Sequence, residues 1–358
     1  MAKKIKLDRP DITIIIPCYN IEKYIDECLD SVMTQSHISQ CEVICINDAS
    51  TDSTKQRLEK YAKRNRHIIH VINNRNNKGV SESRNRGLDI ANGKNIMFID
   101  GDDIIGGKLD SNKVDTHYLQ MFSEEMQANP DAAMIRGEIV TANSELEIQR
   151  TKMCENMLFR SGRIVKNPGT ALSLLDQRIS CCAALYRTDL IQQYALRFTP
   201  GLMYYEDARF TTTYALNSIQ SYKYIFANAP KFSFYVYRRR PDSAMTKLAR
   251  HSESNIRTLE RTKNKLEYYA SLLKHCETVL GADNNFFNIA AHRRAKTAKQ
   301  ISRYKRMSAL VEYDILSDAI PKDCVECDKT NCAACINYSM LKFSIDYYLT
   351  YLTKRKRR

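Results

Sequence analysis

The chain has 358 residues, which indicates a domain of ordinary enzyme size with a second, smaller piece. Hydrophobic residues make up 43% and charged residues 27%, so we expect a folded soluble chain, and the 11 glycines and 8 prolines exclude collagen-like and low-complexity architectures. Residues 1–150 carry a net charge of −3 (20 basic against 23 acidic residues) and the rest +17 (35 against 18). The basic part should therefore meet an anionic partner, such as nucleic acid, a membrane surface or a phosphorylated substrate.

The N-terminal sequence and the cysteines bear on the cellular location. The basic start is followed by Asp8 and Pro10, and the apolar run 12–16 is short, so we expect no signal peptide. No stretch reaches the roughly 20 apolar residues that span a bilayer, and we expect a cytoplasmic protein. Most of the 12 cysteines, including the Cys181–Cys182 pair, should be small buried hydrophobes in a reducing compartment.

The N-terminal part of the chain alternates two kinds of segment. Short β-branched, apolar runs predict buried strands at residues 12–17, 42–47, 67–73 and 95–100. Helices are predicted between them at about residues 22–35, 53–65 and 81–92. Asp52 is a suitable N-cap for the second helix, and Gly93 is suited to end the third. This alternation predicts an α/β fold with a mostly parallel sheet, in which ligands bind beyond the carboxyl ends of the strands.

Polar residues follow each of these strands, and a group of carboxylates follows the fourth. Asp100, Asp102 and Asp103 come directly after a buried strand. Carboxylates this close repel unless a cation lies between them, and Mg²⁺ or Mn²⁺ sites often combine one or two carboxylates with substrate phosphates. We therefore expect a divalent metal at Asp102, with Asp100, facing a diphosphate. The alternative is a turn that caps the next helix.

Four sequence segments, in this order and spacing, carry a family resemblance: IIIPCYN, VICINDASTDST, NNKGVSESRNRGL and IMFIDGDD. They resemble the nucleotide-sugar-binding half of family 2 glycosyltransferases with the GT-A fold. The chain lacks the glycine-rich sequences of dinucleotide and P-loop sites. The resemblance implies a Rossmann-like GT-A domain over residues 1–246, with a nucleotide-binding half (11–105) and an acceptor-side half (106–246). Residues 247–358 are expected to form a mainly helical, basic C-terminal extension.

The resemblance implies roles for individual residues. Asp102, with Asp100, would bind Mn²⁺ or Mg²⁺. Asp48 would accept a hydrogen bond from the imide N–H of the base, a contact that favours uracil or thymine. Arg84 would pair with the diphosphate or the base edge. The residues expected to bind the nucleotide sugar are Pro17, Tyr19, Asn20, Asp48, Arg84, Asp100, Gly101, Arg238 and Arg240.

The family inverts the anomeric centre, so one carboxylate must take the proton of the acceptor hydroxyl. Asp207 is the expected base and Glu206 its support, because the family's Glu-Asp pair lies at this place, at the start of a helix over 208–215. The alternative is that both residues only cap the helix. Arg238 or Arg240 would close over the diphosphate; the alternative there is a solvated basic turn.

The sequence as a whole therefore predicts a metal-dependent, inverting glycosyltransferase. It would move a sugar from a nucleoside diphosphate donor to a hydroxyl of a glycan or lipid-linked acceptor in surface polysaccharide assembly. The expected donor is UDP-linked. One alternative is a nucleotidyltransferase, which would normally have a glycine-rich basic loop after the first strand. Another is a non-catalytic scaffold, derived from a transferase, that docks on membrane or nucleic acid. The intact Asp48, Asp100, Asp102 and Asp207 argue against such a scaffold.

The C-terminal extension carries two further features. Basic residues with interleaved apolar ones at 290–307 and a cationic tail at 341–358 have two interpretations. They form a solvated or self-packed helix, or they dock on anionic lipid headgroups or a lipid-diphosphate acceptor at the inner face of the membrane. Nucleic acid is less favoured because no known binding module accompanies the charge. The spacing of Cys324, Cys327, Cys332 and Cys335 suits a structural Zn²⁺ site, with an iron–sulfur cluster, disulfides or free thiols as alternatives.

Overall fold

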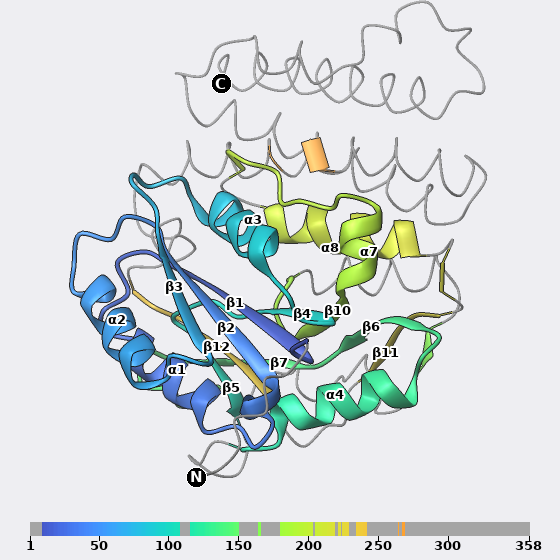
Figure 1. Ribbon diagram of the computed structural model, residues 1–358, viewed down its shortest axis with the longest axis horizontal. Helices are drawn as coiled ribbons and strands as arrows, with labels where there is room; N and C mark the ends of the chain where they lie inside the picture. The colour runs from blue at the N-terminus through green and yellow to red at the C-terminus, as the bar shows by residue number, and fades with distance from the viewer. Residues whose placement is uncertain are drawn as a thin grey trace, which may run out of the picture. The chain divides into compact units, whose positions relative to one another are not determined.

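Figure 1 shows the protein as a computed structural model. The structure describes residues 9–107, 115–149, 164–165, 180–202, 205–218, 221–222, 224–228, 234–241, 264 and 267–268. The chain divides into two compact units, one of residues 1–202 and 206–243 and the other of residues 203–205 and 244–358. Nearly all of the second unit lies outside the described residues, so the domain boundary at residue 246 stays a prediction.

Within the described residues, the main sheet has eight strands in the order β3-β2-β1-β4-β10-β6-β11-β9. Its strands are β1 (Ile12–Cys18), β2 (Cys41–Asn47), β3 (Ile69–Asn73), β4 (Asn95–Phe98), β6 (Ala132–Arg136), β9 (Ile164–Val165), β10 (Ala184–Arg187) and β11 (Tyr224–Asn228). Strands β1 to β4 pair in parallel, β10 is antiparallel to its neighbours β4 and β6, and β9 is antiparallel to β11. The predicted α/β fold with a mostly parallel sheet is therefore confirmed.

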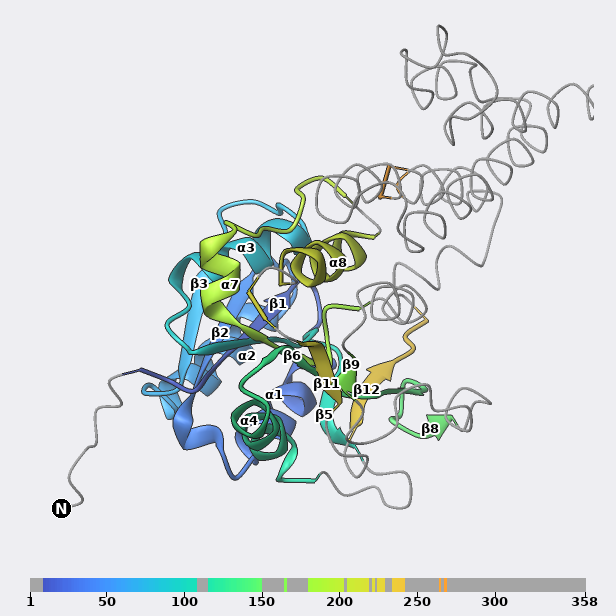
Figure 2. The ribbon, with the colours of Figure 1, turned by 90° about the vertical axis from the view of Figure 1, so that its right-hand side faces the viewer.

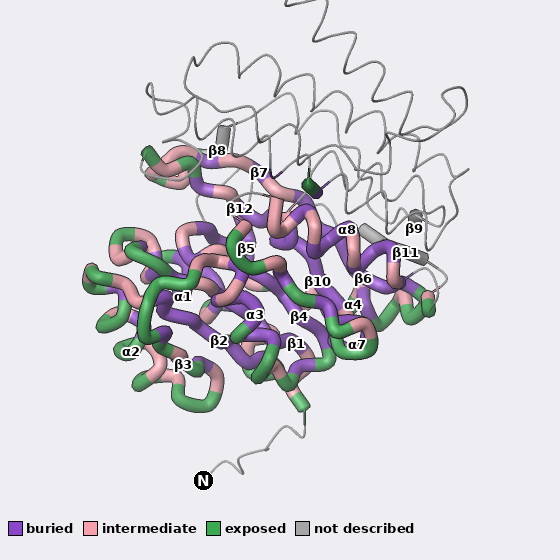
Figure 3. The backbone as a smooth tube through the Cα atoms, turned by 90° about the horizontal axis from the view of Figure 1, so that it is seen from above, coloured by how far each residue is buried: buried purple, intermediate pink, exposed green. Residues whose placement is uncertain are grey.

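Helices cover both faces of this sheet, as Figures 1 and 2 show. On one face lie α3 (Val80–Ile90), α7 (Thr188–Gln193) and α8 (Glu206–Ser218), and on the other lie α1 (Ile25–Met33), α2 (Thr54–Arg64) and α4 (Tyr118–Ala128). A short 3₁₀ helix spans Ile38–Gln40. Because the sheet is covered on both faces, strands β1, β2 and β4 are buried along nearly their whole length (Figure 3), which is why their sequences are continuous apolar runs.

The four N-terminal strands and three helices lie where the sequence predicts them, with ends that differ by a few residues. The carboxylate of Asp52 accepts hydrogen bonds from Thr54 N (3.0 Å) and from Glu22 N (3.1 Å). The helix begins one residue later than predicted, so Ser53 and not Asp52 occupies the N-cap position. Asp52 instead satisfies the N–H of the first helical residue and ties this loop to the one after β1.

Gly93 has a different role from the predicted one, because α3 ends at Ile90 and Gly93 lies beyond it. A Cβ atom at Gly93 would lie 2.4 Å from the backbone N of Thr13. The same corner holds the buried Glu42, whose carboxylate accepts hydrogen bonds from Thr13 Oγ1 (2.5 Å) and Asn92 N (2.6 Å). Glycine is thus required by the close approach of this connection to β1.

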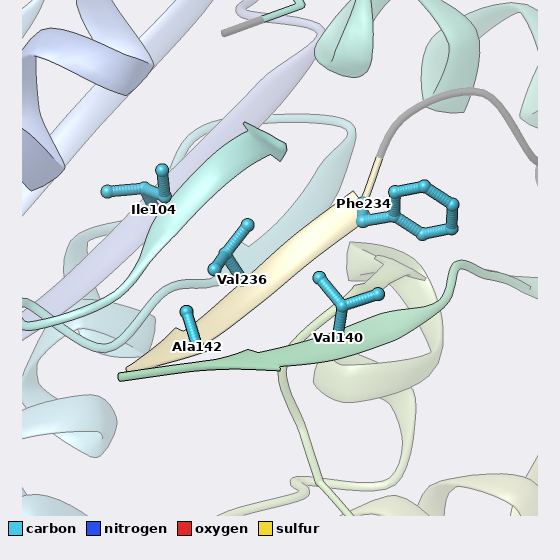
Figure 4. Packing of buried hydrophobic residues seen from close by; sticks show 5 residues of the cluster. All are labelled: Ile104, Val140, Ala142, Phe234 and Val236. Carbon is cyan, nitrogen blue, oxygen red and sulfur yellow. The ribbon is translucent and has the colours of Figure 1, made fainter. Parts of the chain in front are cut away.

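A second sheet has the order β5-β12-β7-β8. Its strands are β5 (Ile104–Gly107), β7 (Ile139–Ala142), β8 (Ile148–Gln149) and β12 (Phe234–Arg238). Figure 4 shows its apolar side chains: Ile104, Val140, Ala142, Phe234 and Val236. Because β5 directly follows the acidic turn 100–103, the alternative that this turn caps a helix is wrong. The sheet instead places β12 beside the turn.

The described cysteines and helices bear on the predicted thiol chemistry and membrane contacts. The six cysteines in the described part of the chain, Cys18, Cys28, Cys41, Cys45, Cys181 and Cys182, are free and buried, as expected. Among the described residues no helix is long and apolar enough to cross a bilayer. Cys324, Cys327, Cys332 and Cys335, the basic segment 290–307 and the tail 341–358 lie outside the described residues, so their proposed roles, like the cytoplasmic location, stay predictions.

Candidate active site

The loops after β1, β2 and β4 lie at the carboxyl edge of the main sheet, because these strands are parallel. The first two loops are joined directly. Asp48 N donates to Cys18 O (2.8 Å), and Asn20 Oδ1 accepts a hydrogen bond from Thr51 N (2.8 Å). Asn20 has a positive φ of 50°, a conformation that asparagine tolerates better than most residues. Its structural role is to fix the shape of this edge.

A buried arginine joins the predicted metal carboxylates to the predicted catalytic pair. Arg84, on α3, has only 4% of its side chain exposed. Its Nη2 pairs with Asp100 Oδ1 (2.7 Å), and its Nη1 pairs with Glu206 Oε1 (3.2 Å). Residues 84 and 206 are 122 positions apart in the chain. The structure thus brings the end of β4 and the start of α8 to one charged cluster.

Aromatic packing holds the start of α8 in this place. The guanidinium of Arg84 lies over the ring of Phe198, 5.1 Å from its centroid. Phe198 stacks on Phe210 of α8 with ring centroids 4.2 Å apart, and Phe98 at the end of β4 meets both rings edge-on. These three buried rings connect β4 and α8 beneath the charged cluster, and the contact with Phe198 stabilises the cation.

Glu206 and Asp207 form the first turn of α8, as predicted, and both are half-buried. Burial raises the pKa of Glu206, while the charge of Arg84 lowers it. Burial and the neighbouring Glu206 raise the pKa of Asp207 to about 7. One oxygen of Asp207 accepts a hydrogen bond from Ala208 N (2.7 Å). Asp207 thus also satisfies an N–H in the first turn of α8, as the helix-capping alternative predicts. A carboxyl group with a pKa near neutrality can exchange a proton under physiological conditions.

The three carboxylates after β4 have different environments. Asp103 is 1% exposed and accepts hydrogen bonds from Tyr235 Oη (2.6 Å) and Arg238 N (2.8 Å). Tyr235 Oη in turn accepts a hydrogen bond from Asp100 N (3.1 Å). Asp103 therefore holds the acidic turn against β12. Asp102 instead pairs with Arg240, with 2.6 Å between Oδ2 and Nε.

The three consecutive arginines after Tyr237 differ in burial and in the groups that they contact. Arg238 is buried: its Nε donates to Asp102 O (2.9 Å), its Nη1 to Ser144 O (2.9 Å), and its Nη2 pairs with Glu27. Arg239 is exposed, and Arg240 is half-buried. The alternative of a solvated basic turn is thus wrong for Arg238 and Arg240. Since Arg238 is held by protein groups, Arg240 is the better candidate for a ligand contact.

Asp100 and Asp102 fit a divalent metal of the Mg²⁺ or Mn²⁺ type. Arg84 is shared between Asp100 and Glu206, and Arg240 pairs with Asp102, so three carboxylates face two arginines and a further cation would balance the remaining charge. Burial raises the pKa of Asp102, Arg240 lowers it, and the nearby Asp100 raises it further. No group of three or more His, Cys, Asp or Glu residues suited to metal is found within the described ranges. Two carboxylates suit a metal whose other ligands come from phosphates and water.

The remaining predicted donor-binding residues lie at the same edge. Tyr19 is an exposed aromatic residue (47%), and Pro17 is half-buried. Asp48 is buried, and its carboxylate accepts hydrogen bonds from Gly79 N (2.7 Å), Lys78 N (3.0 Å) and the Asn74 side chain (2.6 Å). Asp48 therefore holds the loop 74–79 after β3.

Gly101 permits close packing of the acidic turn on the end of β1. A Cβ atom there would lie 2.4 Å from Ile21 Cδ1 and 3.2 Å from Pro17 O. A larger residue would push the turn, and with it Asp100 and Asp102, away from the sheet edge.

Sequence reasoning missed Tyr24, Phe198 and Tyr235. The ring of Tyr24, which precedes α1, faces both Arg238 (5.0 Å from guanidinium carbon to ring centroid) and Arg240 (5.2 Å). These contacts join segments far apart in the chain, and no local pattern signals them.

Comparison with known proteins decides the family. Residues 13–193 match the sequence model described as Glycosyl transferase family 2. The chain belongs to this family. A curated relative is the poly(ribitol-phosphate) beta-glucosyltransferase of Bacillus spizizenii, 40% identical over 98 residues, or 27% of this chain and 16% of the relative. The chain spans less than two thirds of the length of the first curated relatives that it matches, 62% for one and 16% for the other.

Two solved structures resemble this fold. A crystal structure of S. aureus TarS 1–349 in complex with UDP-GlcNAc superposes with a TM-score of 0.58 at 19% identity, covering 87% of this chain and 79% of that one. The mannosyltransferase PcManGT from Pyrobaculum calidifontis, in complex with GDP-Man and Mn²⁺, gives 0.50 at 15% identity and covers 96% and 87%. These likenesses show the GT-A-like fold, and the second shows that a relative of this fold binds a divalent metal.

The central role of Arg84 can be tested by stability. In Arg84→Met, Asp100 and Glu206 lose their shared counterion in a largely buried place, and we expect the free energy of unfolding to fall by about 3 kcal/mol. Arg197→Met is the matched control, because Arg197 pairs with Asp89 at 3.0 Å but both side chains are exposed, and it should cost less than about 1 kcal/mol. Urea denaturation measures both; equal losses would contradict the role given to Arg84.

Proposed function

We propose that the protein is a metal-dependent, inverting glycosyltransferase. It moves a sugar from a UDP-linked donor to a hydroxyl of a glycan or lipid-linked acceptor in surface polysaccharide assembly. The observation that carries the proposal is the double ion pair of Arg84 with Asp100 and Glu206, since it puts the metal carboxylates and the catalytic pair in one cluster. Family membership supports the reaction class.

The base of the donor would lie at the end of β1. The exposed ring of Tyr19 offers a stacking surface there. Asp48 accepts four hydrogen bonds from the loop 74–79, because the N–H of Lys78 is shared between its two oxygens at 3.0 and 3.2 Å. The imide N–H of uracil would replace the longer of these two shared contacts, so that Asp48 would both shape the loop and select the base.

The diphosphate would lie beside the acidic turn. Asp102, with Asp100, would hold the metal, which when bound neutralises charge on the leaving nucleoside diphosphate. Arg240 lies at Asp102 already and would contact the diphosphate as a charge-assisted donor. Arg238 would act indirectly, by holding the backbone of Asp102.

Asp207 would take the proton of the acceptor hydroxyl as that oxygen attacks the anomeric carbon from the side opposite the leaving group. Its raised pKa, about 7, makes it a stronger base than an ordinary aspartate. Glu206 supports it in two ways: its charge raises the pKa of Asp207, and its pair with Arg84 fixes the start of α8.

The comparisons support the donor and acceptor classes proposed. TarS, with a similar fold, is known in complex with UDP-GlcNAc. The relative from Bacillus spizizenii is named for a poly(ribitol-phosphate) substrate, which is a polyanion. An anionic polymer or lipid-linked acceptor would also suit the net charge of +17 on the part of the chain after residue 150.

A donor screen tests the proposal. Wild-type protein with Mn²⁺ and a panel of UDP-sugars should release UDP from at least one donor when an acceptor extract is present. Asp102→Ala should abolish both transfer and metal-dependent binding of UDP, as measured by calorimetry, because the remaining carboxylate cannot hold the metal alone. No release with any nucleotide sugar, together with tight binding to liposomes or RNA, would favour the scaffold alternative.

The base assignment is tested by Asp207→Asn. The amide keeps the size of the side chain but cannot accept the proton, so transfer should fall by at least about 100-fold. Donor binding should stay within about twofold, because Asp207 does not contact the proposed nucleotide site. Near-normal turnover in this variant would show that another group is the base.

The pH dependence follows from the raised pKa of Asp207. The base works only when deprotonated, so kcat/KM should be constant above about pH 7 and fall roughly tenfold per unit below it. An aspartate with an ordinary pKa near 3.9 would leave the profile flat down to about pH 5. A profile with no break near pH 7 would contradict this assignment.

A further inference from the structure

The ion pair between Arg240 and Asp102 lies where the proposed metal must bind. The Nε of Arg240 is 2.6 Å from Oδ2 of Asp102, and the two side chains are only 15% and 19% exposed. A carboxylate oxygen so engaged cannot also ligate a hard cation without losing this contact, and a guanidinium beside a divalent ion is repelled by it. Arginine and metal therefore compete for Asp102.

The surrounding residues stabilise the guanidinium of Arg240 beside Asp102. The guanidinium carbon of Arg240 lies over the ring of Tyr24, 5.2 Å from the ring centroid. Tyr24 is itself fixed, because the buried Arg238 faces the same ring at 5.0 Å. Such contacts stabilise a partly desolvated cation. Arg240 is thus held at Asp102 by a prepared site and not by the ion pair alone.

The backbone allows Arg240 to leave this place without disturbing the sheet. Strand β12 ends at Arg238, and the N–H of Arg239 still donates to Ala142 O (2.9 Å). Arg240 follows this hydrogen bond in the chain and lies outside strand β12. Its side chain can therefore reorient toward a new anion while Arg238 keeps the acidic turn in position.

We propose that Arg240 couples metal binding to donor binding, an inference that rests on the proposed function. Without donor, Arg240 takes the place of the divalent cation on Asp102. When a nucleoside diphosphate enters, its phosphates accept Arg240, and Asp102 becomes available to the metal. By linkage, the diphosphate then raises the affinity for metal, and the metal raises the affinity for the diphosphate by the same factor. The donor-free protein would consequently hold metal weakly.

Manganese binding measured by electron paramagnetic resonance, with and without UDP, tests this coupling. In Arg240→Gln, without nucleotide, Mn²⁺ should bind roughly tenfold tighter than in wild type, within the usual range of coupling between sites. The factor by which UDP tightens Mn²⁺ binding should shrink to a similar extent. Arg239→Gln is the matched control: it removes the same charge from an exposed neighbour and should change the affinity by less than about twofold.

Asp102→Asn separates this inference from the proposed function. If Asp102→Asn abolishes Mn²⁺ binding but Arg240→Gln binds Mn²⁺ no tighter than wild type without UDP, the coupling is overturned and the metal site stands. If Asp102→Asn binds Mn²⁺ as wild type does, the metal site is overturned, and the coupling with it. A purely structural role for Arg240 would weaken Mn²⁺ binding in Arg240→Gln, opposite in sign to the expected effect.

Discussion

The candidate site depends on one buried cation surrounded by carboxylates. Arg84 lies on a helix packed against the main sheet, and its two nitrogens hold Asp100 and Glu206 at fixed positions. Desolvated charges of one sign cannot gather without a counter-charge, so the acidic turn and the start of α8 approach each other only because Arg84 lies between them. The aromatic rings beneath the guanidinium determine its direction, and the pKa of Asp207 is raised by the surroundings that result.

The second sheet is the other support of the site. Its strand β12 reaches the acidic turn through Tyr235 and Arg238, which bind Asp103 and the backbone of Asp102. One carboxylate of the turn is thereby used to fix the other two. Three of the four residues 100–103 are aspartates, and one of them, Asp103, holds the turn on β12 through buried hydrogen bonds.

Much of this arrangement can be predicted from the sequence, and the limit is physical. The strands up to residue 98 are short, mostly apolar runs that alternate with helical segments, so their type and their parallel arrangement follow from local patterns. The position of Asp102 directly after a strand likewise predicts that it lies at the carboxyl edge of the sheet, as it does. By contrast, Arg238, Arg239 and Arg240 are chemically identical in the sequence, yet the first is buried against Glu27, the second is exposed and the third pairs with Asp102. Contacts with residues more than a hundred positions away separate them, and no window of sequence contains that information. The packing role of Gly93 could not be predicted for the same reason, because it depends on the close approach of Gly93 to Thr13 in the folded chain.

The spacing of the contacts around Arg84 has a consequence for how the site forms. Its bond to Asp100 spans 16 residues, whereas its bond to Glu206 spans 122. Contacts between distant residues form late, because closing a long loop costs entropy before the contact can repay it. During synthesis the strands β1 to β4 emerge with Arg84 and Asp100 already able to pair, well before α8 leaves the ribosome. This part of the sheet can therefore begin to organise before Glu206 and Asp207 have been made, and the arrival of Glu206 completes the charged cluster.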